Sequence, residues 1–142
     1  FDVVLIDCPP SLGILTINGL TAATEVLIPL QCEALGQRGV AQLLETIDDV
    51  RSYTNPDLAI TGVVATMFGG RTKLAHQVVS EVREIHGLEV LDPPVPKSVK
   101  AAEAPGRGLS VLEHAPRSRP AEAYRELAQR TFGAPRRRKG RR

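Results

Sequence analysis

The chain alternates short continuous apolar runs with longer stretches in which apolar residues recur at helical spacing. Apolar runs at 3–6, 25–30, 58–68 and 90–91 are typical of strands that are buried on both faces of a parallel sheet. Between them, apolar residues fall on one face of a helix in 37–53 and 74–85. Alternating strands and helices with right-handed crossovers predict a parallel α/β fold.

Prolines and glycines set the expected boundaries of these elements. Asn55-Pro56-Asp57 ends the first long helix, and Gly87 closes the second. A final helix is predicted over 119–132, with Pro120 in its first turn and a stop at 133–135. The remaining expectations are a short helix over 18–23, a strand that ends or becomes irregular at Pro29, and irregular chain over 98–108.

The first apolar run ends in an acidic residue that two prolines follow at once. Cys8-Pro9-Pro10 cannot continue a strand, because proline lacks the N–H that a ladder needs. Asp7 is therefore expected at the carboxyl end of a central strand, where open α/β sheets bind ligands. A carboxylate there suits the water shell of a nucleotide's magnesium. The alternative is the ordinary role of aspartate in a turn.

Charge divides the chain into a body and a tail. The 142 residues fit one domain with a net charge of +2, and the segment 135–142 carries six basic residues and no acid. Without those six charges the body has a net charge of −4. Like charges with nothing apolar to bury predict a disordered tail. It could add an electrostatic grip on DNA, or it could be a solubilising end.

The cysteines and histidines form no recognisable motif. Cys8 and Cys32 match no metal or redox spacing, which favours small buried hydrophobes in a reducing cytosol. A nucleophilic Cys8 is the alternative, although no histidine lies near it in sequence. The three histidines are scattered and are interpreted as surface residues: His76, His86 and His114. No apolar run approaches the ~20 residues of a membrane-spanning helix.

The segment from Leu5 to Gly13, Leu-Ile-Asp-Cys-Pro-Pro-Ser-Leu-Gly, resembles the Walker B and switch segment of the ParA/Soj chromosome- and plasmid-partitioning ATPases. The resemblance implies a P-loop NTPase-like fold of the deviant Walker A (SIMIBI) type, a three-layer α/β/α sandwich with a mostly parallel sheet. It also implies that Asp7 orients the water shell of Mg²⁺. The loop that would report the γ-phosphate to the dimer face consists of Cys8, Pro9, Pro10 and Ser11.

The phosphate-binding loop Gly-x-x-x-x-Gly-Lys-[Ser/Thr] does not occur in the sequence. The resemblance places a deviant form of it before residue 1. The expectation is that residues 1–134 are the C-terminal part of a ParA-type ATPase domain, and that the chain by itself does not hydrolyse ATP. Without the phosphate-loop strand, one edge of a central strand would be left unpaired, which favours association.

Two further segments resemble the family and carry basic residues. The segment 66–72, Thr-Met-Phe-Gly-Gly-Arg-Thr, resembles a family loop in which the arginine contacts DNA, although Gly69 stands where the family usually has aspartate. That role carries over to Arg71, against the alternative of a solvated turn arginine. In 95–105, Lys100 takes the place of a second DNA-contacting residue, and a point charge suffices for phosphate. Arg117 or Arg119 could add to this surface.

The same two segments offer candidates for the adenine pocket, Met67 and Pro96, with a core role as the alternative. As a whole, the resemblance implies ATP and Mg²⁺ as cofactors, an ATP-dependent homodimer, nonspecific DNA binding, and a ParB-like partner that stimulates hydrolysis. It implies a cytoplasmic, nucleoid-associated protein.

Two related protein families and one non-enzymatic function are the remaining alternatives. MinD-like ATPases end in an amphipathic membrane helix, whereas this sequence ends in arginines with no apolar face, which disfavours a membrane. Cobyrinate amide synthases are expected to be more distant. The competing interpretation is a non-enzymatic DNA- or partner-binding module derived from this fold.

Overall fold

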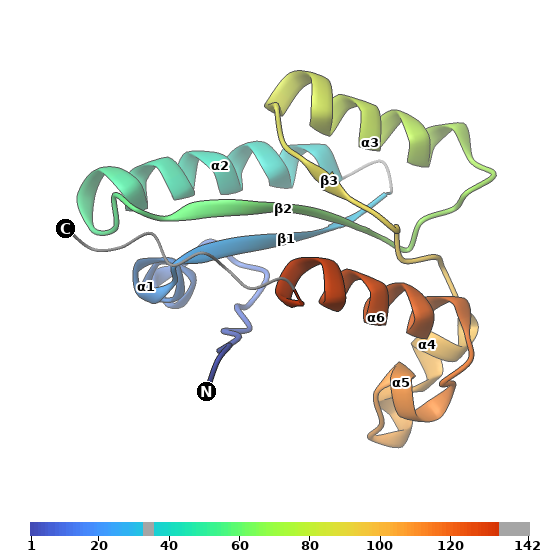
Figure 1. Ribbon diagram of the computed structural model, residues 1–142. Coiled ribbons are helices and arrows are strands. Elements are labelled where there is room, and N and C mark those ends of the chain that lie inside the picture. The colour runs from blue at the N-terminus through green and yellow to red at the C-terminus, as the bar shows by residue number, and fades with distance from the viewer. Residues whose placement is uncertain (33–35, 134–142) are drawn as a thin grey trace.

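A computed structural model describes residues 1–32 and 36–133 (Figure 1). The basic tail, 135–142, lies outside the described residues. In chain order the elements are α1 (Ile14–Ala22), β1 (Glu25–Gln31), α2 (Gly36–Tyr53), β2 (Ala59–Thr66), α3 (Lys73–His86), β3 (Val90–Leu91), α4 (Val99–Glu103), a 3₁₀ turn η1 (Pro105–Arg107), α5 (Val111–His114) and α6 (Arg119–Phe132).

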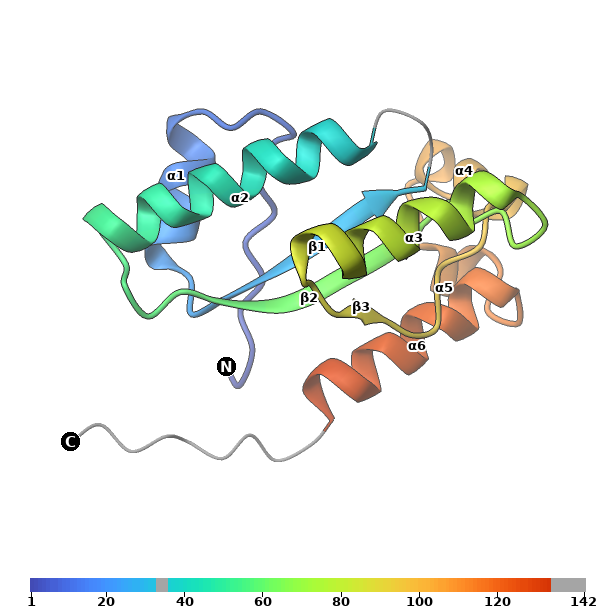
Figure 2. The ribbon, with the colours of Figure 1, turned by 90° about the horizontal axis from the view of Figure 1, so that it is seen from above.

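The strands form one sheet in the order β1-β2-β3, and both pairs are parallel. Each pair is joined by a helical crossover, α2 between the first two strands and α3 between the last two. Helices α2 and α3 cover one face of the sheet and α6 covers the other, so the described part of the chain is a three-layer α/β/α arrangement (Figures 1 and 2). The predicted fold class is confirmed.

Aliphatic side chains build a core on each face of the sheet. Val63, Val78 and Val82 are almost fully buried between the strands and the α2–α3 layer. On the opposite face, Val64 packs with Leu127 of α6. A third cluster, in which Ile47 of α2 is fully buried, joins α1 to α2. Adjacent strand residues thus face different layers, as the period of two in a strand requires.

The pairing of β1 with β2 contains one irregularity. The register shifts between Val26 and Leu27, opposite Gly62, whose φ of 150° is a conformation that side chains rarely adopt. Pro29, by contrast, neither ends nor disturbs the strand, which continues to Gln31. β1 has no strand on its other side among the described residues, so the missing N–H of Pro29 breaks no ladder bond.

Most expected boundaries hold to within two residues. Helix α6 spans the predicted range, with a proline at its start and Gly133 as its C-cap. Gly87 closes α3 in the left-handed conformation, with φ 61°. Helix α1 begins four residues earlier than expected, at Ile14. The irregular segment 98–108 contains α4 and η1, and α5 was not predicted.

The predicted strand at 3–6 is wrong for this structure. Residues 1–13 contain no strand or bridge, and Val4 and Leu5 are 74% and 76% exposed. An apolar run indicates a demand for burial, but a strand forms only where another strand offers a ladder. Here the segment lies beside α1: a Cβ on Gly19 would meet Cγ2 of Ile6 at 3.5 Å.

Candidate nucleic-acid interface at the carboxyl end of the sheet

The end of β2 and the turn after it are joined to the segment that precedes α4 by three backbone hydrogen bonds. The N–H of Val95 donates to Ala65 (2.8 Å), that of Phe68 to Val95 (2.9 Å), and that of Lys97 to Phe68 (3.3 Å). Phe68 and Pro96 form a parallel bridge. The two segments that resemble the family therefore lie side by side at the carboxyl end of the sheet.

This junction also brings together the two candidates for the adenine pocket. Met67 directly precedes the bridge and Pro96 is part of it. Met67 has a φ of 49° and is 46% exposed, so it is not a core residue. A left-handed conformation in a non-glycine residue costs of order 1–2 kcal/mol and is frequent at functional sites. Pro96 is half-buried.

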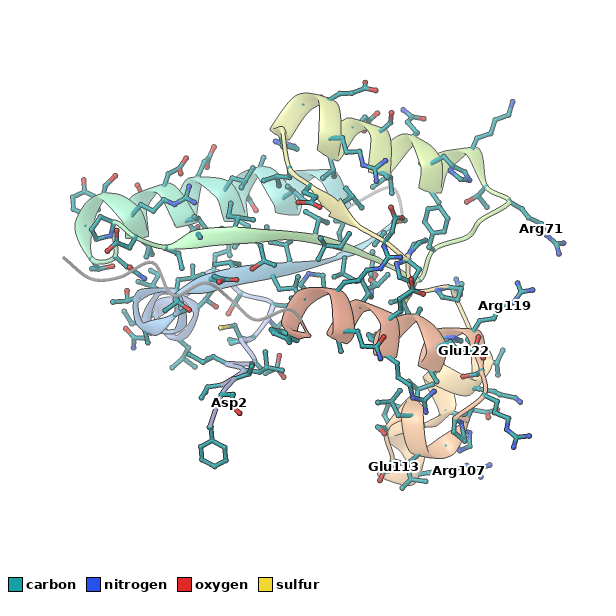
Figure 3. The ribbon with its side chains drawn as sticks, viewed as in Figure 1. Asp2, Arg71, Arg107, Glu113, Arg119 and Glu122 are labelled. Atoms are coloured by element: carbon teal, nitrogen blue, oxygen red, sulfur yellow. The ribbon has the colours of Figure 1, made fainter. Side chains whose placement is uncertain are left out.

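Arg71 lies in the turn between β2 and α3 and points away from the sheet (Figure 3). At the base of the turn, the N–H and the hydroxyl of Thr72 both donate to the carbonyl of Gly69, at 2.8 Å each. A Cβ on Gly69 would lie 3.0 Å from Oγ1 of Thr72, so a larger residue there would require a small shift of the threonine side chain. The turn presents Arg71 as an exposed guanidinium.

Lys100 is exposed on the short helix α4 and lines an open hollow together with Arg117. In the same hollow, Nε2 of His114 lies 3.5 Å from a carboxylate oxygen of Glu103. The side chain of His114 is only 12% exposed, so its prediction as a surface residue is wrong. The hollow thus contains two cationic side chains, Lys100 and Arg117, beside the carboxylate of Glu103, which contacts His114.

Arg117 and Arg119 flank the start of α6. The guanidinium of Arg125 donates to the carbonyl of Pro116 at 2.6 Å and holds the preceding loop against the helix. Arg119 projects on the same side of the molecule as Arg71 (Figure 3). Acidic residues lie among these cations, including Glu113 and Glu122, so the charge of this end is positive at particular points rather than throughout.

The candidate magnesium residue is not brought to this end of the sheet. Asp7 is exposed in the irregular N-terminal segment, and Figures 1 and 2 show residues 1–13 beside α1, away from the turn after β2. The physical reason is the missing strand, since only a strand between paired neighbours would have placed Asp7 at the carboxyl edge. The expected meeting of Asp7 with the Arg71 turn does not occur in this structure.

The candidate switch loop, Cys8 to Ser11, is tied to α1 by a residue that the sequence did not single out. The hydroxyl of Thr16, which is 5% exposed, donates to the carbonyl of Ser11 at 2.6 Å. Sγ of Cys8 approaches α1 at Gly19, where a Cβ would lie 2.8 Å away. The sequence signal that could have identified Thr16 was a hydroxyl near the start of a helix that follows a proline-rich loop.

The cysteines fit their interpretation in part. Cys32 is buried, and burial raises the pKa of its thiol, because the thiolate loses hydration. Cys8 is half-buried. Among residues 1–32 and 36–133, no group of three or more His, Cys, Asp or Glu side chains could hold a metal ion.

No helix among the described residues is long and apolar enough to cross a bilayer.

Comparison with known proteins gives a consistent result over nearly the whole chain. Residues 1–60 match the AAA domain family. The chain is 46% identical over 91% of its length to the sporulation initiation inhibitor protein Soj of Bacillus subtilis, and covers 51% of that protein. It is also 46% identical, over 97% of its length, to the chromosome partitioning protein ParA of Myxococcus xanthus, of which it covers 50%. The chain thus spans about half the length of these curated relatives.

Solved structures agree on the fold. A crystal structure described as cobyrinic acid a,c-diamide synthase from Mycobacterium smegmatis, with bound ATP analog and magnesium, matches 94% of this chain and 50% of its own. The TM-score is 0.72 and the identity 44%, so the expectation that such proteins are more distant is wrong for this one. The ATP complex of a McdA variant from Cyanothece matches 87% of this chain and 48% of its own, with a TM-score of 0.70 and 19% identity, which shows the fold alone.

Proposed function

Because the chain belongs to the ParA/Soj family of chromosome-partitioning ATPases, we propose that it forms part of a partition ATPase that dimerises with ATP and then holds DNA without sequence preference. The observation that carries the proposal is the junction of the Arg71 turn with the segment leading to Lys100. Two exposed cations on segments that meet at this end of the sheet can both contact the phosphates of one duplex.

The nucleotide site of this proposal is shared with polypeptide outside these residues. The chain spans about half the length of its relatives, and a phosphate-binding loop in the other half would complete the site. ATP and Mg²⁺ would supply the hydrolysable phosphoryl group and its charge neutralisation. With the segment 3–6 paired as a strand against that other half, Asp7 would face the magnesium's water shell, and Met67 and Pro96 would line the base. The chain alone is not catalytically competent.

The remaining parts of the proposal follow from the family. The loop from Cys8 to Ser11 responds to the γ-phosphate and changes the dimer face, as switch loops of nucleotide hydrolases do. A ParB-like partner stimulates hydrolysis and releases the DNA. The protein works in the cytoplasm on the nucleoid. The basic tail, 135–142, adds up to six phosphate contacts.

The test measures retention of a DNA duplex of arbitrary sequence by the protein expressed from its whole gene, with and without ATP. Arg71→Glu abolishes ATP-dependent retention and leaves ATP binding intact. Arg130→Glu is the matched control, because it makes the same charge change on the last turn of α6, where Arg130 pairs with Glu126. Lys100→Ala makes the slope of log affinity against log salt shallower by about 0.9 for each phosphate that the lysine had neutralised. Retention by Arg71→Glu equal to that of the control removes Arg71 from the site.

A second candidate function comes from the 44%-identical structure, which is described as a diamide synthase. Such an enzyme also uses ATP and magnesium, so nucleotide binding does not separate the two. DNA retention does: an amide synthase has no ATP-dependent affinity for a duplex. Retention that is strongly salt-dependent but indifferent to ATP would instead favour the non-enzymatic DNA-binding module.

A further inference from the structure

We propose that His76 is a positioning residue, which fixes the turn carrying Arg71 and so prepares that arginine for a phosphate. The inference rests on the proposed DNA-binding function of Arg71. His76 lies in the first turn of α3 and is exposed, and its ring bridges between the turn and the end of the sheet. Its role is indirect, because His76 acts on the turn and Arg71 makes the contact.

The turn needs such support because its own sequence is permissive. Gly69 and Gly70 are consecutive, and glycine restricts the backbone less than any other residue. Thr72 closes the base of the turn through two hydrogen bonds to the carbonyl of Gly69. Neither bond reaches Gly70, the residue directly before Arg71.

His76 supplies the contact to that residue. Its Nε2 lies 3.1 Å from the carbonyl oxygen of Gly70. The ring of His76 also meets the ring of Phe68 edge to face, with centroids 5.2 Å apart and an interplanar angle of 84°. Phe68 is itself fixed by backbone hydrogen bonds on both sides to Val95 and Lys97. The imidazole therefore connects Gly70 to a rigid part of the sheet edge.

The chemistry of the contact defines what can replace it. A carbonyl oxygen only accepts, so Nε2 must carry the proton, and both the neutral ring with hydrogen on Nε2 and the imidazolium satisfy this requirement. The amide nitrogen of glutamine can donate in the same way, whereas phenylalanine keeps the ring contact and cannot donate. A turn that is already ordered loses less conformational entropy when Arg71 binds a phosphate.

The experiment is a double-mutant cycle on the protein expressed from its whole gene, read out as ATP-dependent affinity for duplex DNA. His76→Leu weakens binding by about three- to tenfold, the effect expected when one hydrogen bond and one ring contact no longer restrict the turn. His76→Gln recovers part of the loss and His76→Phe recovers less. In an Arg71→Ala background, His76→Leu has no further effect.

Gln77→Leu is the control, because Gln77 is the next exposed residue of α3 and its side chain donates to Glu81 rather than to the turn. It keeps wild-type affinity, and thermal unfolding confirms that all variants fold. Provided that Arg71→Ala weakens DNA binding, two results overturn the inference. One is a His76→Leu variant that binds DNA with wild-type affinity. The other is a loss of affinity from His76→Leu that is as large in the Arg71→Ala background as in the wild type. If Arg71→Ala itself binds as tightly as wild type, the proposed function fails instead, and the inference fails with it.

Discussion

Asn55 fastens the C-terminal end of α1 to the loop between α2 and β2, and its replacement tests how α1 is held to the core. Its side-chain amide donates to the carbonyls of Ala23 (2.8 Å) and Leu20 (3.1 Å), more than thirty residues away in sequence. The last carbonyls of a helix have no partner within the helix. Asn55 thus acts as a C-cap for α1 that is supplied by a distant part of the chain.

Asn55→Asp removes both donors while preserving the shape of the side chain. Each half-buried hydrogen bond contributes about 0.5–1.5 kcal/mol net, so losing both lowers the free energy of unfolding by about 1–3 kcal/mol. The carboxylate also faces two carbonyl oxygens, which repel it and favour the upper part of that range. Asn55→Ala, which removes the donors without adding a charge, falls in the lower part.

Urea unfolding measures the change, and hydrogen exchange of the α1 amides shows whether the loss is local. Thr21→Val is the matched control, because the Thr21–Thr54 hydrogen bond (2.9 Å) joins the same two elements but is exposed. An exposed contact of this kind is worth less than about 0.5 kcal/mol. The reasoning is refuted if Asn55→Asp destabilises the protein no more than Thr21→Val does.

Two further substitutions test the central strand β2 and the C-terminal helices. Gly62→Ala lowers the free energy of unfolding by about 1–3 kcal/mol, because φ is 150° there and the new Cβ would lie 3.0 Å from the carbonyl oxygen of Glu89; an unchanged urea midpoint would contradict this. Ser110 donates to the carboxylate of Glu113 through its N–H and its hydroxyl, and these hydrogen bonds lower the pKa of that carboxyl. The contact therefore stabilises α5 fully at pH values above the usual glutamate pKa, and this stabilisation is lost as the pH falls through the lowered pKa. The difference in thermal midpoint between wild type and Glu113→Gln therefore shrinks on acidification, and a difference that is independent of pH would exclude the effect.

The three long helices, α2, α3 and α6, and all three strands were predictable from the sequence because their signals are local. The range of α6 follows from its early proline and the glycine after it, both within 119–133. The turn carrying Arg71 was predictable for the same reason, since it follows a strand and precedes an amphipathic helix. Parallel pairing then places Arg71 near the segment of Pro96.

The apolar run before Asp7 shows the limit of such signals. Its composition is as strand-like as that of β1, yet β1 has β2 beside it and the run at 3–6 has no ladder among the described residues. Contacts such as those from Asn55 to Ala23 were equally hidden, because both partners are ordinary loop and helix-end residues in the sequence.

The spacing of aliphatic residues, prolines and glycines in the sequence determined the local order of this protein. It set which residues form helices, which are extended and where each element ends. Tertiary structure decided which extended segments became strands, and which side chain supports the turn that carries Arg71. Helical hydrogen bonds close within four residues, whereas a ladder or a bridging imidazole needs a partner that only folding brings near.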